Sequence, residues 1–321
     1  MDVATLALPL FDLIFLGFAA GKFIPLPEHG LAGLSLFVLY FALPALFFSL
    51  ISETPIEDLG NWTFIAATTA ATFVTLLLGF AVGMVSSRGK VGEATIQALA
   101  AGYANNGYMA PGLTLSAFGP AAAVPTALVF CFDNLMIFIL APIGLAIGTG
   151  GGATPGEVAR RVVVRVVTHP FILATAAGVL AAAIHFRPPA PVAEMLDLLS
   201  GAAAPCALFA LGIVLAKQPL RRVPVELPVL IALKLAAHPA LVYLFLSIAG
   251  DFDPVWVFTA VLIASLPAAT NVFVIAQQYG VWVNRASSVV LFSTLVAVAT
   301  VTGLLYAIGA GWLPADLFPA R

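Results

Sequence analysis

Ten apolar segments, each long enough to cross a lipid bilayer as a helix, follow one another along this chain. A membrane-spanning helix needs about 20 mostly apolar residues. Short connections separate the segments and hold most of the charged residues, as in "SSRGK" at 86–90 and "KQPLRR" at 217–222. The segments occupy residues 4–24, 30–52, 61–85, 93–118, 121–148, 163–186, 191–216, 226–249, 255–279 and 285–309. We therefore expect an all-α polytopic membrane protein with ten transmembrane helices.

The composition excludes several other classes of protein. Of the 321 residues, 62% are hydrophobic and 9% are charged, which is more apolar surface than a water-soluble domain of this size can bury. A formal net charge of −2 offers no basic surface for nucleic acid. The two cysteines, Cys131 and Cys206, lie far apart within apolar segments, so neither a disulfide nor a metal site is expected.

Lysine and arginine residues divide unevenly between the two ends of the predicted helices. Positive residues near short loops are retained on the cytoplasmic side of a membrane. The loops after odd-numbered segments hold Lys22, Arg88, Lys90, Arg160, Arg161, Arg165, Lys217, Arg221, Arg222 and Arg285. The other loops and the termini hold only Arg187 and Arg321. We expect both termini on the non-cytoplasmic side of a bacterial inner membrane, and a first span that is mature because "MDVATLALPL" lacks the basic stretch of a secretory signal.

The two halves of the chain resemble each other. "DLIFLGFAAG" at 12–21 aligns without gaps with "HPFILATAAG" at 169–178, and "LPALFF" at 43–48 resembles "APCALF" at 204–209. Five helices in each half is an odd number, so the second copy would enter the membrane from the opposite side. Inverted repeats are typical of alternating-access carriers. The predicted domains are a first repeat at 1–152, a cytoplasmic linker at 153–162 and an inverted second repeat at 163–321.

The fourth and ninth segments are both interrupted, and they hold equivalent places in the two repeats. "NNGYMAPG" (105–112) and "SLPAATN" (265–271) carry proline or glycine in apolar surroundings, where each should open the helix near the bilayer centre. Backbone groups freed there need a polar cavity or a ligand. The predicted substrate-binding residues are Asn105, Asn106, Tyr108, Pro111, Ser265, Pro267, Thr270 and Asn271. The alternative is a pair of kinked helices whose asparagines bond between helices.

Four polar residues at membrane depth form a second group of candidates. Ionisable groups in a membrane are costly and usually face a cavity or a partner. Asp133 and Asn134 lie in the fifth segment, and Lys234 and His238 lie four residues apart in the eighth. A carboxylate at Asp133 could bind sodium, carry a proton or pair with a cation. We expect these residues to couple transport or attract an anion; the alternative is a structural Asp133–Lys234 ion pair.

The chain resembles the auxin efflux carrier family, part of the bile acid/arsenite/riboflavin transporter-like superfamily. The resemblance rests on "FVIAQQYGVWVNRASSVVLFSTLVAVATV" at 273–301, "ALPALFF" at 42–48, "KLAAHP" at 234–239 and the interrupted fourth segment. Plant members have a long loop between spans 5 and 6. The short connection here is similar to that of bacterial members regarded as permeases for malonate or other organic acids.

The resemblance implies several further features. Spans 1, 2, 6 and 7 would form a scaffold, and spans 3–5 and 8–10 a moving transport domain of the elevator type. The two broken helices would cross, and the protein would be a homodimer. An asparagine near the break of the fourth helix would contact the substrate carboxylate, and Asn105 and Asn106 both match that position.

The favoured function is a secondary transporter of small organic carboxylates, either auxin-like or malonate-like. A sodium-coupled symporter of the bile-acid type is the alternative, with Asp133, Asn134, Thr270 and Asn271 as a cation site; H+ is the other candidate coupling ion. A non-transporting sensor or a channel is a further alternative. An enzyme is not expected, because the chain has no HExxH or GxSxG motif and no paired aspartates in a protease-like arrangement. The expected partners are the organic anion and the lipid bilayer.

Overall fold

A computed structural model describes residues 3–25, 27, 30–55, 59–149, 155–217 and 225–318. This part of the chain is helical and contains no strand; its one extended pairing is an isolated antiparallel bridge between Ala104 and Ala268. The first repeat predicted from the sequence holds α1 (Val3–Phe23), α2 (Gly30–Phe37), π-helical η1 (Val38–Ala42), α3 (Leu43–Ser52), α5 (Trp62–Ser86), α6 (Val91–Gly102), α7 (Ala110–Phe118), η2 (Pro120–Ala122) and α8 (Ala123–Thr149). The all-helical prediction is confirmed.

The second half of the chain follows with a similar succession of helices. It holds α9 (Pro155–Val167), α10 (Pro170–Ala183), α11 (Ala190–Lys217), α12 (Leu227–Ala232), π-helical η3 (Leu233–Ala237), α13 (His238–Ala249), α14 (Pro254–Ala264), α15 (Thr270–Tyr279) and α16 (Val283–Gly309). The segment expected as one span at 163–186 is instead divided between α9 and α10. His169 precedes Pro170, and a residue before proline is pushed out of helical geometry, which explains the division.

Six helical segments within the described ranges are long and apolar enough to cross a membrane. They are Gly30–Ser52, Trp62–Ser86, Pro120–Gly148, Ala190–Lys217, Leu227–Ala249 and Val283–Gly309. Pro170–Ala183 and Pro254–Ala264 are apolar but shorter. The expected fourth and ninth spans do not qualify because each is interrupted, by the gaps between α6 and α7 and between α14 and α15. A polytopic membrane protein is thus confirmed, whereas the count of ten spans stays a prediction.

Neighbouring helices approach closely where glycines face each other. A Cβ atom on Gly148 of α8 would lie 2.1 Å from the backbone nitrogen of Gly92 in α6, and one on Gly212 of α11 would lie 2.1 Å from the carbonyl oxygen of Ile14 in α1. Both contacts are closer than any side chain permits. Small residues at helix interfaces are the usual means by which membrane helices pack.

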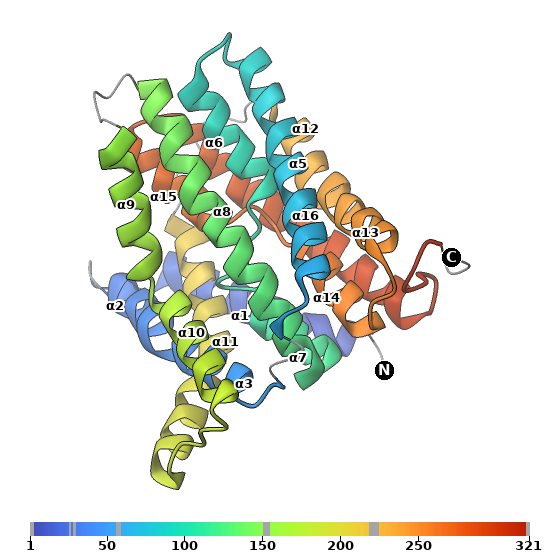
Figure 1. Cartoon of the computed structure of the whole chain (residues 1–321). Helices are drawn as coiled ribbons and strands as arrows, with labels where there is room; N and C mark the ends of the chain where they lie inside the picture. Colours follow the sequence, from blue (N-terminus) through green and yellow to red (C-terminus); the bar gives the residue numbers. More distant parts are fainter. Residues whose placement is uncertain are drawn as a thin grey trace.

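The helices form two groups with separate hydrophobic cores. The larger core runs through α5, α6, α8 and α12 to α16, with contributions from α1 and α11. The smaller core joins η1 and α3 to α10, α11 and the first third of α8, where the rings of Phe47, Phe130 and Phe171 pack in tilted and edge-on arrangements. In Figure 1, α2, α3, α10 and α11 lie together at the lower left, and α5, α12 and α13 at the upper right. The division into scaffold and transport domain stays a prediction.

Candidate functional site

The two interrupted helices meet at their breaks. The amide nitrogen of Asn105 donates to the carbonyl oxygen of Pro267 at 2.9 Å, and the amide nitrogen of Ala269 donates to the carbonyl oxygen of Tyr103 at 2.9 Å. These bonds form the antiparallel bridge between Ala104 and Ala268. Each break therefore supplies backbone partners that the other has lost, which is how irregular backbone is tolerated within a membrane protein.

Local sequence explains where each break lies. The first helix stops at Gly102, and α7 begins at Ala110 with Pro111 in its first turn. The second stops at Ala264, and Pro267, which has no N–H to donate, lies in the gap before α15. The amide nitrogen of Ala268 donates to the side-chain hydroxyl oxygen of Ser293 in α16, at 3.2 Å. The interruptions predicted from the sequence are both present.

A polar chain extends from the crossing toward α8 and α15. The hydroxyl of Tyr103 donates to Oδ1 of Asn134 at 2.7 Å, and the Asn134 amide donates to the carbonyl of Phe130 at 2.8 Å. The side-chain amide of Asn271 donates to the same Tyr103 hydroxyl at 3.3 Å. Sequence reasoning selected Asn134 and Asn271 but missed Tyr103, which stands two residues before the motif that signalled the break.

A second polar chain joins the two breaks by another route. Nδ2 of Asn106 donates to Oδ2 of Asp133 at 3.4 Å, and the side chain of Thr72 in α5 also interacts with this carboxyl group. The Thr72 hydroxyl lies 3.0 Å from Nε2 of His238, whose Nδ1 lies 3.1 Å from Nζ of Lys234. Thr72 could not be selected from the sequence, because it is one of several threonines in the same helix and nothing in the local sequence distinguishes it from the others.

Lys234 ends this chain at the second break. Its Nζ donates to the carbonyl oxygen of Ala264, the last residue of α14, at 2.6 Å. The side chain is fully buried and starts from the π-helical turn η3, a rare geometry that recurs at functional sites. The positive ammonium group thus offsets the partial negative charge at the C-terminal end of α14.

The direct Asp133–Lys234 ion pair considered from the sequence is not formed. Among the described residues, the salt bridges are Lys90–Glu93 at 2.9 Å and Arg285–Glu226 at 3.1 Å. Asp133 and Lys234 interact electrostatically at longer range, with Thr72 and His238 between them. The buried acid and base therefore belong to a chain of four side chains.

Three buried polar atoms at the crossing have no hydrogen-bond partner among the described residues. They are Nδ2 of Asn105, Oδ1 of Asn106 and Oδ1 of Asp133, on side chains that are 2%, 1% and 3% exposed. An unsatisfied buried polar group costs about 1–3 kcal/mol, and more when it is charged. Such a cluster of one open donor and two open acceptors is suited to receive a polar ligand or ion.

The remaining predicted residues lie around the crossing without joining these chains. Thr270 is buried at the start of α15, and the Ser265 hydroxyl donates to the carbonyl of Leu262 in its own helix at 2.7 Å. Pro111 is buried in the first turn of α7. Tyr108 instead bonds Ser35 of α2 and packs against both hydrophobic cores.

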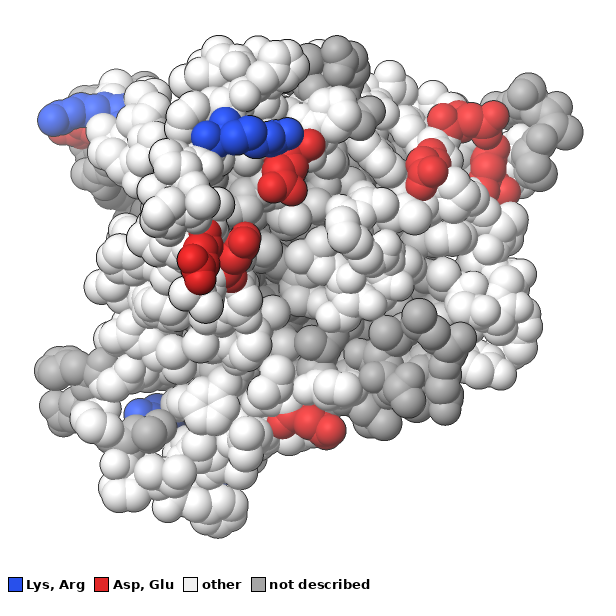
Figure 2. Space-filling model, turned by 90° about the horizontal axis from the view of Figure 1, so that it is seen from below, with Lys and Arg blue, Asp and Glu red and all other residues white. Residues whose placement is uncertain are grey.

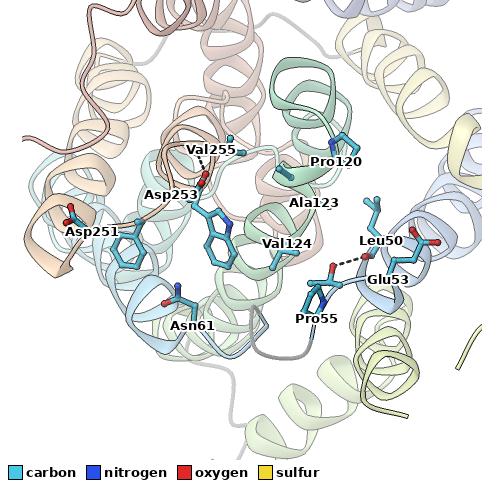
Figure 3. A pocket seen from close by; sticks show the side chains of 14 residues that line it. Leu50, Glu53, Pro55, Asn61, Pro120, Ala123, Val124, Asp251, Asp253 and Val255 are labelled. Carbon is cyan, nitrogen blue, oxygen red and sulfur yellow. Dashed lines mark hydrogen bonds between the residues drawn. The ribbon is translucent and has the colours of Figure 1, made fainter. Parts of the chain in front are cut away.

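An open cavity of about 810 Å³ lies near one end of the bundle. Figure 3 shows Glu53, Asp251 and Asp253 among the residues that line it, with Val124 of α8 at its wall. Lysine, arginine and histidine are absent from the described residues that line it. Acidic side chains are also scattered over the face shown in Figure 2, where basic ones are visible at few places.

The polar chain lies deeper along the same helices. A small space between α5, α8, α13 and α14 is lined by Thr72, Asp133 and His238, and it is too narrow to admit water in this conformation. Asp133 follows Val124 by nine residues on α8, which corresponds to about 14 Å at 1.5 Å per residue. The acidic cavity thus opens about two and a half helical turns from the buried carboxyl group along α8.

Comparison with known proteins reveals similarity along almost the whole chain. A family model described as "Membrane transport protein" matches residues 2–305. A protein of Rhizobium meliloti (strain 1021) named "Putative malonate transporter" is 52% identical over 318 residues, which cover 99% of each chain.

Proposed function

The chain belongs to the membrane transport protein family, and from this premise we propose that it moves small organic carboxylate anions by alternating access. The family resemblance to auxin efflux carriers is confirmed, and the protein is a membrane transporter, not an enzyme. The name of the 52% identical relative makes malonate the first substrate to test. Auxin-like indole acids are the second.

The observation that carries the proposal is the crossing of the two breaks beside unpaired amide groups. Two helices, α7 and α15, begin at the crossing, and helix N-termini attract anions through their free N–H groups and dipoles. Nδ2 of Asn105 adds an open donor. In our proposal the substrate carboxylate binds these groups, and Asn105 and Asn106 contact it directly.

A proton is the coupling ion that the side-chain contacts favour. Asp133, Thr72, His238 and Lys234 follow one another through polar contacts, and such a chain can hold and pass a proton. The sodium alternative needs oxygens of Asp133, Asn134, Thr270 and Asn271 around one ion. Yet Oδ1 of Asn134 is bonded by Tyr103, in a polar chain separate from that of Asp133.

The negative charge of the acidic cavity favours the entry of a cation over that of an anion. The carboxyl groups of Glu53, Asp251 and Asp253 face no basic side chain among the described residues of the lining, so they would attract cations and repel a carboxylate substrate. We therefore infer that the coupling ion reaches Asp133 from this cavity. The organic anion would enter or leave there only after a conformational change.

The wider architecture is part of the same proposal. Ten spans in two inverted five-helix repeats would relate the α6/α7 break to the α14/α15 break, in keeping with their antiparallel bridge. Elevator movement of spans 3–5 and 8–10 against spans 1, 2, 6 and 7, a homodimer, an inner-membrane location and non-cytoplasmic termini complete it. Residues 153 and 154 of the predicted linker lie outside the described residues.

Uptake of labelled malonate into proteoliposomes tests the proposal. We expect saturable uptake by the wild type, stimulated by an inward proton gradient, and loss of most of it in Asn105→Ala and Asn106→Ala. Asn284→Ala is the matched control, because Asn284 is exposed at the start of α16. Malonate should also raise the melting temperature of the wild type, through its preferential binding to the folded state. Equal uptake and equal shifts in all four proteins would refute the site; single-channel conductance would refute a carrier.

A further inference from the structure

The short helix α9, which connects α8 to α10, has a composition unlike the rest of the chain. Its sequence, "PGEVARRVVVRVV", contains three arginines and six valines within 13 residues. At 100° per residue, Arg160, Val163, Val164 and Val167 lie on one face, since they are spaced i, i+3, i+4 and i+7. Arg161 and Arg165, spaced i and i+4, fall on the adjoining strip of the helix. An apolar stripe is thus bordered by positive charge.

This stripe faces outward in the structure. Val163, Val164 and Val167 are 57%, 48% and 54% exposed, and Arg160 is exposed beside them. In Figure 1, α9 lies at the edge of the bundle alongside α8 and runs down to α10. The described part of the chain therefore leaves a row of valines uncovered.

A lipid bilayer is the partner that fits both halves of this surface. The chain spans a membrane, so lipid is the medium next to an outward apolar face. Amphipathic helices that carry basic residues lie in the membrane interface and prefer anionic lipids. Arginine side chains can bury their stems among acyl chains while the guanidinium group reaches a phosphate.

The position of α9 strengthens the charge argument. Its first residues lie at the same end of the bundle as the connection between α5 and α6, which carries Arg88 and Lys90 (Figure 1). By the distribution of basic residues this is the cytoplasmic end, where anionic lipid headgroups attract lysine and arginine.

We propose that α9 is a binding site for anionic phospholipid, in which the outward valines contact acyl chains, the positive charge of the helix attracts the headgroups, and Arg160 beside the valines binds a headgroup phosphate. Because α9 links α8, which carries Asp133, to α10, lipid bound there would hold the connection between the two groups of helices. Transport that depends on anionic lipid is a consequence that rests on the proposed function; lipid binding itself does not.

Lipid binding is tested by the melting temperature of the purified protein in detergent, with phosphatidylglycerol or phosphatidylcholine added. We expect phosphatidylglycerol to stabilise the wild type by several degrees more than phosphatidylcholine, through preferential binding to the folded state. The triple variant Arg160→Gln, Arg161→Gln, Arg165→Gln should lose most of this difference, and the triple Arg→Lys variant should keep most of it. Arg88→Gln with Lys90→Gln is the matched control: it removes positive charge at the same end of the bundle but not from α9, and it should keep most of the difference.

Further measurements distinguish a lipid headgroup from free phosphate as the ligand, and test the role of the valines. Glycerol phosphate and inorganic phosphate at equal concentration should give no shift, and Val163→Ser with Val167→Ser should weaken the shift caused by phosphatidylglycerol. A full shift in the triple Gln variant, or an equal shift with inorganic phosphate, would overturn the proposal. Malonate uptake in vesicles with and without phosphatidylglycerol then tests the consequence for transport. A protein that binds the lipid but takes up no malonate would contradict the proposed function alone.

Discussion

Asn105 donates its backbone N–H to the carbonyl oxygen of Pro267, 2.9 Å away, and so joins the two places where the chain abandons helical geometry. The bond comes from the residue whose side-chain Nδ2 has no partner in the described part of the chain. The backbone of Asn105 therefore helps to join the two breaks, and its side chain presents an open hydrogen-bond donor. A ligand bound by that donor would be sensitive to any shift between α7 and α15.

Tyr103→Phe should destabilise the protein without changing its shape. The substitution removes one hydroxyl that donates to Asn134 and accepts from Asn271. Because Oδ1 of Asn134 is then left buried without that donor, we expect the free energy of unfolding to fall by about 1–2 kcal/mol. Thermal unfolding in detergent measures the loss. Tyr40→Phe, at a residue that is 57% exposed, should leave the melting temperature unchanged; equal effects of the two substitutions would contradict the assignment.

Asp133→Asn should separate substrate binding from coupling. Asparagine has the shape of aspartate and can still accept from Asn106, but it cannot carry the charge or the proton. We expect malonate uptake driven by a proton gradient to fall at least about tenfold, which corresponds to about 1.4 kcal/mol. Exchange of labelled for unlabelled malonate across vesicles without a gradient should stay within about twofold, since binding is retained.

Asp197→Asn serves as the control for this comparison, because Asp197 is an exposed acid on α11. It should change neither uptake nor exchange. If Asp133→Asn lost uptake and exchange to the same extent, the carboxyl group would belong to the substrate site and not to coupling.

The helix breaks could be predicted from the sequence, whereas most of the contacts around them could not. Proline and glycine in an apolar segment act on their own helix, so "NNGYMAPG" and "SLPAATN" located both breaks. The contacts of Tyr103 and Thr72 depend on which helices lie next to each other after folding. A tyrosine before the motif and a threonine in α5 have the same local signature whether they bond to a buried amide or to nothing.

Lys234 illustrates the same limit. Its burial and its nearness to His238 followed from spacing along one helix, but its bond to the carbonyl of Ala264 required the end of another helix to lie within reach. The ion pair with Asp133, the alternative considered from the sequence, is chemically reasonable for two buried charges. It is not formed because Thr72 and His238 lie between them and a helix end supplies the acceptor.

Lys234→Met should abolish transport while preserving the fold. The substitution leaves the Ala264 carbonyl without its donor, at a cost of about 1–3 kcal/mol. It also removes a buried charge, whose desolvation costs several kcal/mol, so the two effects oppose each other. We expect a melting temperature near or above that of the wild type, and at least tenfold less malonate uptake.

The contrasting substitution is Lys90→Met, at a side chain that is 70% exposed and paired with Glu93. Such surface pairs contribute at most about 1 kcal/mol, so uptake and melting temperature should both resemble the wild type. A Lys234→Met protein that unfolds during purification, or one that retains full uptake, would contradict the role given to the ammonium group.

Two glycine substitutions should have opposite effects on stability. A Cβ at Gly148 would lie 2.1 Å from the nitrogen of Gly92, so Gly148→Ala must push α8 away from α6. Separating two packed helices removes contacts along their whole interface, and we expect a loss of about 2 kcal/mol or more.

Gly303 lies within α16, and nothing is found within 4 Å of a Cβ built there. Gly303→Ala should therefore stabilise the protein by about 0.5–1 kcal/mol, because alanine loses less backbone entropy in a helix. Thermal unfolding of both variants and the wild type in one detergent gives the comparison. The close packing of α6 and α8 would be disproved if Gly148→Ala were as stable as Gly303→Ala.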